Sequence, residues 1–130
     1  MTFIVLFIST AVLAAHDLRI TDSRGTEVVV KNAAIDYSGF MASDKDSEGI
    51  RVLQGDGVVH VKWTDVDTLK VTRRDDSARP PRLEIEVVLR NGRKVPAALL
   101  RQGQMRLLGV TELGDYSIEL DKVRAITPVR

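Results

Sequence analysis

One pattern of glycine and apolar residues occurs twice in this chain, and it constrains the fold more than any other feature. It covers residues 57–69, Gly-Val-Val-His-Val-Lys-Trp-Thr-Asp-Val-Asp-Thr-Leu, and residues 114–126, Gly-Asp-Tyr-Ser-Ile-Glu-Leu-Asp-Lys-Val-Arg-Ala-Ile. Without a gap, the pairs after the glycine are Val61 with Ile118, Trp63 with Leu120, Val66 with Val123, and Leu69 with Ile126. Such spacing predicts a half-buried strand, one helical turn and a short closing strand. The matching offsets favour two related units over coincidence.

The upstream sequence extends the match. Gly25 and the valines at 28–30 align with Gly92 and Val95 if the first unit carries about ten extra residues, which fall at 43–49. Between the units, Pro80-Pro81 cannot donate hydrogen bonds to a sheet and stiffens the chain. The sequence therefore predicts a first β repeat at 16–73, a linker at 74–81 and a second β repeat at 82–130.

The remaining sequence is typical of strands. Runs at 28–30, 58–61, 83–89 and 117–120 are β-branched or alternate between apolar and polar residues, and no window of 11 or more residues sustains a helical stripe. Asn91-Gly92 predicts a hairpin with a two-residue turn. We therefore expect an all-β fold of two related small barrel-like halves of antiparallel strands, each with a one-turn helix, preceded by a signal peptide.

The leader is expected at residues 1–15. This stretch has no charged side chain and is mostly apolar, but it is too short to span a bilayer as a helix. It resembles a signal-peptide core with small residues for cleavage after Ala14 or Ala15, although no Lys or Arg precedes it. A buried first strand or helix is the alternative. Export without any cysteine favours a bacterial periplasmic or secreted protein, with no integral membrane segment after cleavage.

Charge and aromatic content argue against a nucleic-acid partner. The chain has 19 basic and 18 acidic residues, a net charge of +1, so it lacks the one-sided field of a nucleic-acid binder. Beyond the leader the aromatic residues are Tyr37, Phe40, Trp63 and Tyr116, too few for a base-stacking platform.

Each half resembles a small SH3-like or Sm-like β-barrel. The resemblance is carried by Val-Leu-Arg-Asn-Gly-Arg-Lys-Val at 88–95, Leu-Gly-Val-Thr at 108–111 and Gly-Asp-Tyr-Ser-Ile-Glu-Leu at 114–120. Tandem repeats of this kind recur in exported bacterial proteins of unknown function. The resemblance implies architecture rather than an activity. The loop motifs of RNA-binding Sm-like proteins are not reproduced, for example at 101–104, so RNA binding is not implied.

One string resembles a metal-binding loop. Asp44, Asp46 and Glu48 precede Gly49 with the alternate spacing that opens a calcium loop of the EF-hand type. The twelfth position, which should supply a bidentate glutamate, is Gly55, and Lys45 adds a positive charge. These features favour a solvated acidic loop.

No catalytic residue or cofactor is expected. His60 alternates with Val59 and Val61, which points it to the surface, and no partner for a general base is evident. Trp63 is expected in the core. Asp65 and Asp67 fit the polar face of a helical turn, and the sequence has no phosphate loop, nucleophile elbow or Cys/His set.

Three functions remain open on the sequence alone. The leading hypothesis is an exported, non-enzymatic binding or assembly module with a protein partner, because small barrels expose edge strands. The first alternative is an enzyme or accessory acting on a cell-envelope polysaccharide or peptide, with Asp65, Asp67 or His60 in a cleft. The second is a structural protein that self-assembles through its strand edges at 83–89.

Overall fold

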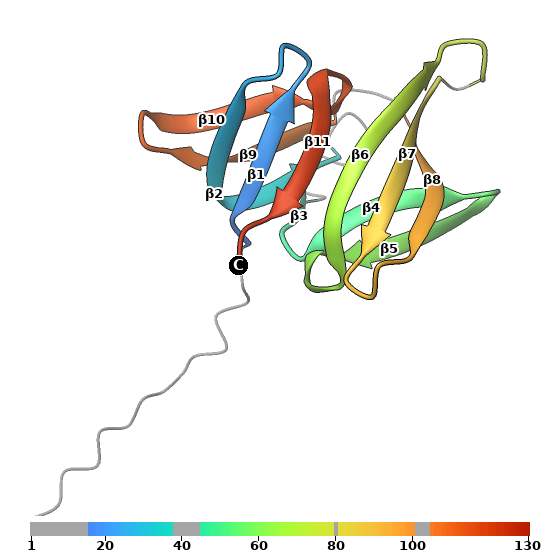
Figure 1. Ribbon diagram of the computed structural model, residues 1–130. Coiled ribbons are helices and arrows are strands. Elements are labelled where there is room, and N and C mark those ends of the chain that lie inside the picture. The colour runs from blue at the N-terminus through green and yellow to red at the C-terminus, as the bar shows by residue number, and fades with distance from the viewer. Residues whose placement is uncertain (1–15, 38–44, 80, 101–104) are drawn as a thin grey trace, which may run out of the picture.

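The structure, a computed structural model, describes residues 16–37, 45–79, 81–100 and 105–130 (Figure 1). Strands make up 70% of these residues and short helical turns 6%, which confirms the all-β class. The leader expected at 1–15 lies outside the described residues. The elements are β1 (Leu18–Asp22), β2 (Glu27–Asp36), β3 (Lys45–Asp46), β4 (Gly49–Gln54), β5 (Gly57–Lys62), η1 (Trp63–Asp65), β6 (Val66–Asp75), β7 (Arg82–Leu89), β8 (Lys94–Leu100), β9 (Arg106–Thr111), β10 (Gly114–Glu119), η2 (Leu120–Lys122) and β11 (Val123–Pro128).

The described strands form one antiparallel sheet that curls into a half-barrel. The strand order is β10-β9-β2-β1-β11-β6-β7-β8-β4-β5, and β3 pairs with β2 off this path. Figure 1 shows the sheet dividing into two groups that meet where β11 pairs with β6. We call β1, β2, β9, β10, η2 and β11 the terminal lobe, and β4, β5, η1, β6, β7 and β8 the central lobe.

Each lobe combines strands from both sides of the expected linker. In the terminal lobe, β1 pairs with β11 and β2 pairs with β9. In the central lobe, β7 pairs with β6 and β8 pairs with β4. The pairing therefore differs from an arrangement in which each sequence half closes its own barrel. Whether the halves are related repeats is a separate matter and stays a prediction.

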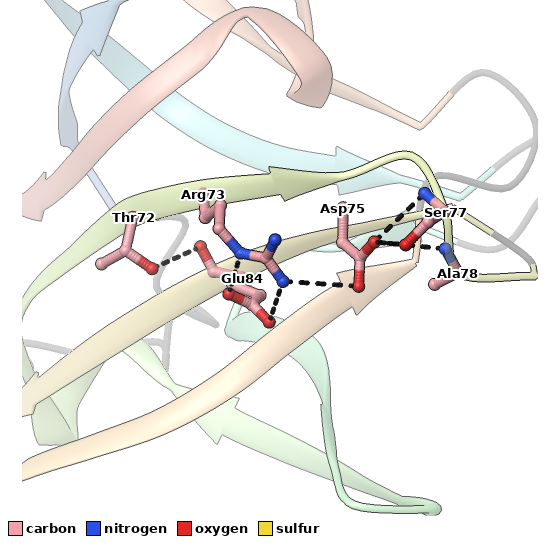
Figure 2. Close-up of polar contacts among 6 residues, drawn as sticks. All are labelled: Thr72, Arg73, Asp75, Ser77, Ala78 and Glu84. Atoms are coloured by element: carbon pink, nitrogen blue, oxygen red, sulfur yellow. Dashed lines mark hydrogen bonds and ion pairs between the residues drawn. The ribbon is translucent and has the colours of Figure 1, made fainter.

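The two sequence halves also pair directly with each other on either side of 74–81, where we expected a linker. Arg74 and Asp75 belong to β6 and pair with Leu83 and Arg82 of β7, so β6 and β7 lie antiparallel beside each other. One carboxylate oxygen of Asp75 accepts hydrogen bonds from the backbone of Ser77 and Ala78, at 3.1 and 3.2 Å, and from the Ser77 hydroxyl at 2.6 Å (Figure 2). This aspartate-centred turn reverses the chain and keeps β7 beside β6. Pro80 lies outside the described residues.

Several backbone hydrogen bonds occur once in each lobe, at corresponding positions. Both 3-10 turns begin with such a bond: Trp63 donates to the Glu48 carbonyl at 2.9 Å, and Leu120 donates to the Met105 carbonyl at 3.0 Å. The β1–β2 and β7–β8 hairpins are each tied to the 3-10 turn of their own lobe. The corresponding bonds run from Ser23 to the Lys122 carbonyl, 2.9 Å, and from Arg90 to the Asp65 carbonyl, 3.0 Å. The strand, one-turn helix and strand expected at 57–69 and 114–126 are thus present in both segments.

The hairpin expected at Asn91-Gly92 is present, but its loop has three residues rather than two. Leu89 and Arg93 flank the loop, and the Leu89 carbonyl accepts the Gly92 N–H at 2.9 Å. Gly92 has φ +88°, the left-handed conformation that ends a three-residue hairpin loop. Within the loop, the Asn91 side chain accepts the Arg93 N–H at 2.9 Å.

A single apolar core runs through both lobes. The residues of the twice-occurring pattern contribute to it directly, because Trp63 and Leu69 are fully buried in the central lobe and Leu120 and Ile126 are buried in the terminal lobe. Val61 and Ile118 are half-buried and pack against the same core. Burial of these side chains is the main stabilising contribution available to a domain that has no cysteine.

Candidate functional site

The residues of the calcium-like string that the structure describes stabilise a turn. Asp46 ends β3, and one of its carboxylate oxygens accepts the backbone N–H groups of Glu48 and Gly49 at 3.0 and 3.1 Å. Its other oxygen contacts the ring of His60. Asp44 lies outside the described residues. Within the described part of the chain, no group of three or more His, Asp or Glu side chains is arranged to hold a metal ion.

His60 projects from β5 on the outer face of the sheet, opposite to Val59 and Val61, as the alternation along the strand predicts. Its side chain is 40% exposed, and its Nε2 pairs with the carboxylate of Asp46. Sequence reasoning missed this partner, because only the β4–β5 hairpin brings β5 back to the end of β3. The contact is a surface ion pair or hydrogen bond that joins two strands.

The other residues considered for chemistry do not form a cleft. Asp65 and Asp67 are exposed on η1 and β6. Trp63 is fully buried, and its ring N–H has no hydrogen-bond partner among the described residues. A ligand at the surface therefore cannot contact the indole ring, and Trp63 has the core role that the sequence predicts.

The two ends of the sheet path are β5 and β10. Within residues 16–37, 45–79, 81–100 and 105–130, β5 pairs with β4 alone and β10 pairs with β9 alone. An edge strand presents backbone donors and acceptors to a further strand, and proteins usually protect such edges with charges, prolines or bulges. The side chains on these two edges decide which of them is suited to a partner.

Exposed valines distinguish β5 from β10. Val58 is 67% exposed and Val59 is 39% exposed, although these two side chains point to opposite faces of the sheet. On β10 the corresponding positions are Asp115 and Tyr116, and the neighbouring Ser117 accepts a hydrogen bond from Arg106 of β9 at 2.7 Å. β10 is thus the more polar edge, and β5 is the edge with apolar contact surface.

A small hollow lies beside β5 on each face of the sheet. On the outer face, Val58 lines a hollow of about 240 Å³ together with Leu53 of β4, Tyr37 and Met105. Arg51 closes one side of it, with its guanidinium 4.7 Å from the centre of the Tyr37 ring and its backbone N–H 2.8 Å from the Tyr37 hydroxyl. This hollow spans the two lobes.

On the concave face, a second hollow of about 240 Å³ lies between β5 and the β7–β8 hairpin. Its wall is almost wholly aliphatic, and Gln54 is the polar side chain in it. The aliphatic residues are Val52, Val59, Val61, Val87, Leu89, Val95 and Ala97. Sequence alternation places Val59 and Val61 on one face, but the opposing hairpin comes from beyond the expected linker. The hollow was therefore not predictable from the first half of the chain.

A polar network lies at the opposite end of the central lobe from these hollows, near the β6–β7 turn. Arg73 donates to both carboxylate oxygens of Glu84, at 2.8 and 3.1 Å, and lies 3.6 Å from Asp75 (Figure 2). The hydrogen bond from Arg73 holds the pKa of Glu84 below its ordinary value of 4.5. The hydrogen bond from Ser77 lowers the pKa of Asp75 from its own ordinary value of 3.8. These groups lie at the surface and are paired with one another, which is typical of ion pairs that join two strands of a hairpin rather than of a reactive centre.

Comparison of the chain with protein-family models, with curated proteins and with solved structures finds no match. The resemblance to SH3-like and Sm-like barrels therefore stays a prediction from the sequence. No helix in the described part of the chain is both long enough and apolar enough to cross a membrane.

Proposed function

We propose that this protein is an exported, non-enzymatic binding module that accepts an extended segment of a partner protein as an added strand on β5. The observation that carries the proposal is the combination of an open strand edge with an apolar hollow on each of its faces. In strand addition, main-chain hydrogen bonds provide affinity, and pockets for alternate side chains provide specificity. β5 offers both.

Export to the periplasm or outside the cell is part of the proposal. It is supported by the charge-free apolar opening of the sequence and by the absence of cysteine. The proposal also includes an origin by duplication, which is supported by the twice-occurring apolar pattern and by the backbone hydrogen bonds that recur at corresponding positions.

The test is selection of binding peptides from a random library displayed in extended form, followed by affinity measurement. We expect selected peptides to contain alternating apolar residues over about five or six positions, the usual length of a strand. The variant Val58→Lys should weaken their binding about tenfold or more, since it brings a charge into the outer hollow. Its stability should be unchanged because Val58 is largely exposed.

Leu113→Lys is the matched control. Leu113 is a fully exposed apolar residue in the β9–β10 turn, at 101% of its reference area, so the same substitution is made away from β5. We expect it to leave peptide affinity unchanged. Selection that yields no specific peptide, or peptides that bind Val58→Lys as well as the parent chain, would count against strand addition at β5.

Self-assembly through β5 is the second candidate, because the same edge could pair with the β5 of another copy. Sedimentation across a concentration series separates the two functions. A monomer that binds peptides supports the binding module, whereas a concentration-dependent dimer that Val58→Lys abolishes supports assembly.

A further inference from the structure

The strands around the concave hollow beside β5 have counterparts in the terminal lobe, and the two lobes differ in the side chains at these positions. The shared hydrogen bonds and strand registers match β5 with β10 and place Val59 at the position of Tyr116. In the same way, the β7–β8 hairpin matches β1–β2 and places Leu89 at the position of Asp22. The hairpins and edge strands therefore correspond in register, although β2 and β9 pair around an irregularity at 31–34, whereas β8 and β4 pair at Ala98 and Leu53.

In the terminal lobe the chain supplies an aromatic ring at this position. Tyr116 is partly buried and packs against the core. Burial, and to a smaller extent the charge of Asp22, raise the pKa of its phenol. In the central lobe the cross-strand pair is Val59 and Val52, where the terminal lobe has Tyr116 and Gly109, and the aliphatic hollow lies beside these two valines.

The size and lining of the hollow suit one aromatic ring. A cavity of roughly 150 Å³ lined by aliphatic and aromatic side chains is large enough to bind benzene, and this hollow measures about 240 Å³. The position of Asp22, whose charge acts on the Tyr116 phenol, is taken here by Leu89. Because Gln54 is the polar side chain in the wall, a phenol hydroxyl that enters the hollow would have to exchange water for Gln54, whereas a ring without a hydroxyl has no such hydrogen bond to replace.

We infer that the concave hollow takes an aromatic side chain of the partner strand, phenylalanine in preference to tyrosine, at the place that Tyr116 fills in the terminal lobe. This inference rests on the proposed strand addition. A strand added to β5 would carry cross-strand neighbours of Val59 and Val61 on its concave face, within reach of the hollow.

The probes for the test are toluene and p-cresol, the side-chain analogues of phenylalanine and tyrosine, added to the full chain with isotope-labelled valine, leucine and isoleucine methyl groups. We expect toluene to shift the methyl signals of Val59, Val61 and Leu89 and to bind more tightly than p-cresol. Val59→Tyr, which copies the terminal lobe, should weaken toluene binding about tenfold or more because its own ring fills the space. Leu113→Tyr adds the same ring in the β9–β10 turn, away from β5, and should leave toluene binding unchanged.

Two further variants keep the test decisive. Ala97→Val narrows the hollow from β8 and should also weaken toluene binding if Val59→Tyr does not fold. Tyr116→Val should open a second toluene site in the terminal lobe, seen as new shifts in labelled Ile20 and Ile118. Toluene that leaves the Val59, Val61 and Leu89 signals in place, or that binds Val59→Tyr and Ala97→Val as well as the parent chain, would overturn the inference.

The outcome is separable from that of the proposed function. Peptides that bind at β5 without enrichment in aromatic residues, and that bind Val59→Tyr normally, contradict the aromatic site and leave strand addition standing. Toluene that enters the hollow of a chain for which no peptide can be selected supports the ring site and counts against strand addition.

Discussion

At Gly49 the backbone of β4 lies so close to β5 that no side chain fits. A Cβ atom at this position would collide with the backbone carbonyl of Val61, which cannot move without breaking the β4–β5 pairing. Gly49 is also buried at the start of β4, next to the Asp46 turn. The glycine is therefore required by close approach of two strands rather than by an unusual φ angle.

We predict that Gly49→Ala lowers the free energy of unfolding by about 2 kcal/mol, within the usual range for overpacking. Gly57→Ala is the control, since a Cβ at Gly57 would meet only the Gln54 carbonyl at an ordinary 3.5 Å. Urea denaturation of both variants gives the comparison. Equal stabilities would mean that β4 and β5 are farther apart at Gly49 than the structure places them.

The Arg73–Glu84 pair predicts a pH dependence of stability. Because the folded state lowers the pKa of Glu84, the pair stabilises the fold above the ordinary carboxyl pKa of 4.5, and this contribution is lost as pH falls through the lowered folded pKa. We expect Glu84→Gln to reduce the fall in stability between neutral and acidic pH. At neutral pH the substitution should lower the free energy of unfolding only slightly, since both partners are exposed. Thermal melts from pH 7 down to pH 2, in low and high salt, measure it. If Glu84→Gln loses stability at low pH just as the parent chain does, the pair does not cause the pH dependence.

At the scale of single elements, two hairpins share one loop geometry. Gly25 ends the β1–β2 loop with φ +87°, and Gly92 ends the β7–β8 loop with φ +88°. Gly25 donates to the Asp22 carbonyl at 3.0 Å, and Gly92 donates to the Leu89 carbonyl at 2.9 Å. Space is not limiting at either position, since a Cβ at Gly92 has no contact within 4 Å and one at Gly25 meets only the end of the Arg124 side chain.

We predict that Gly25→Ala and Gly92→Ala each cost about 1 kcal/mol, because an L-residue pays that much or more in the left-handed conformation. The two losses should be equal within error, as measured by urea denaturation. A large loss in one variant and none in the other would show that the loops differ, and it would weaken the correspondence on which the aromatic site depends.

Local sequence patterns predicted the strands and turns well, but they did not predict which distant strands pair with each other. Alternation placed Val61, Trp63 and Leu69 on the buried side, and Asn91-Gly92 marked the hairpin. The linker expected at 74–81 shows the limit. Pro80-Pro81 indicates a break, yet the carboxylate of Asp75 closes a turn just before it. Both hollows at β5 form because β4 or the β7–β8 hairpin packs beside β5. The periodicity of one segment does not predict such packing.

At the scale of the whole molecule, the exchange of strands links the two lobes. Each lobe takes strands from both sides of the β6–β7 turn, and one apolar core runs through both. Neither sequence half can therefore unfold without removing strands from both lobes. The exchange predicts one cooperative transition for the described domain rather than two.

Leu107→Ala tests this cooperativity. Leu107 is fully buried in β9 of the terminal lobe, and the change should cost about 2–5 kcal/mol. Trp63, the one tryptophan of the chain, reports on the central lobe by fluorescence. We expect its denaturation midpoint to fall together with that of the whole protein as followed by circular dichroism. A Trp63 midpoint that does not change would mean that the central lobe unfolds independently.

If a partner strand docks on β5, amide hydrogen exchange with and without a selected peptide should show it. The two edges, β5 and β10, provide an internal comparison within one sample. We expect alternate amides of β5 to exchange about tenfold or more slowly in the complex, while those of β10 exchange at the same rate. Protection that appears on β10, or on no amide of β5, would contradict it.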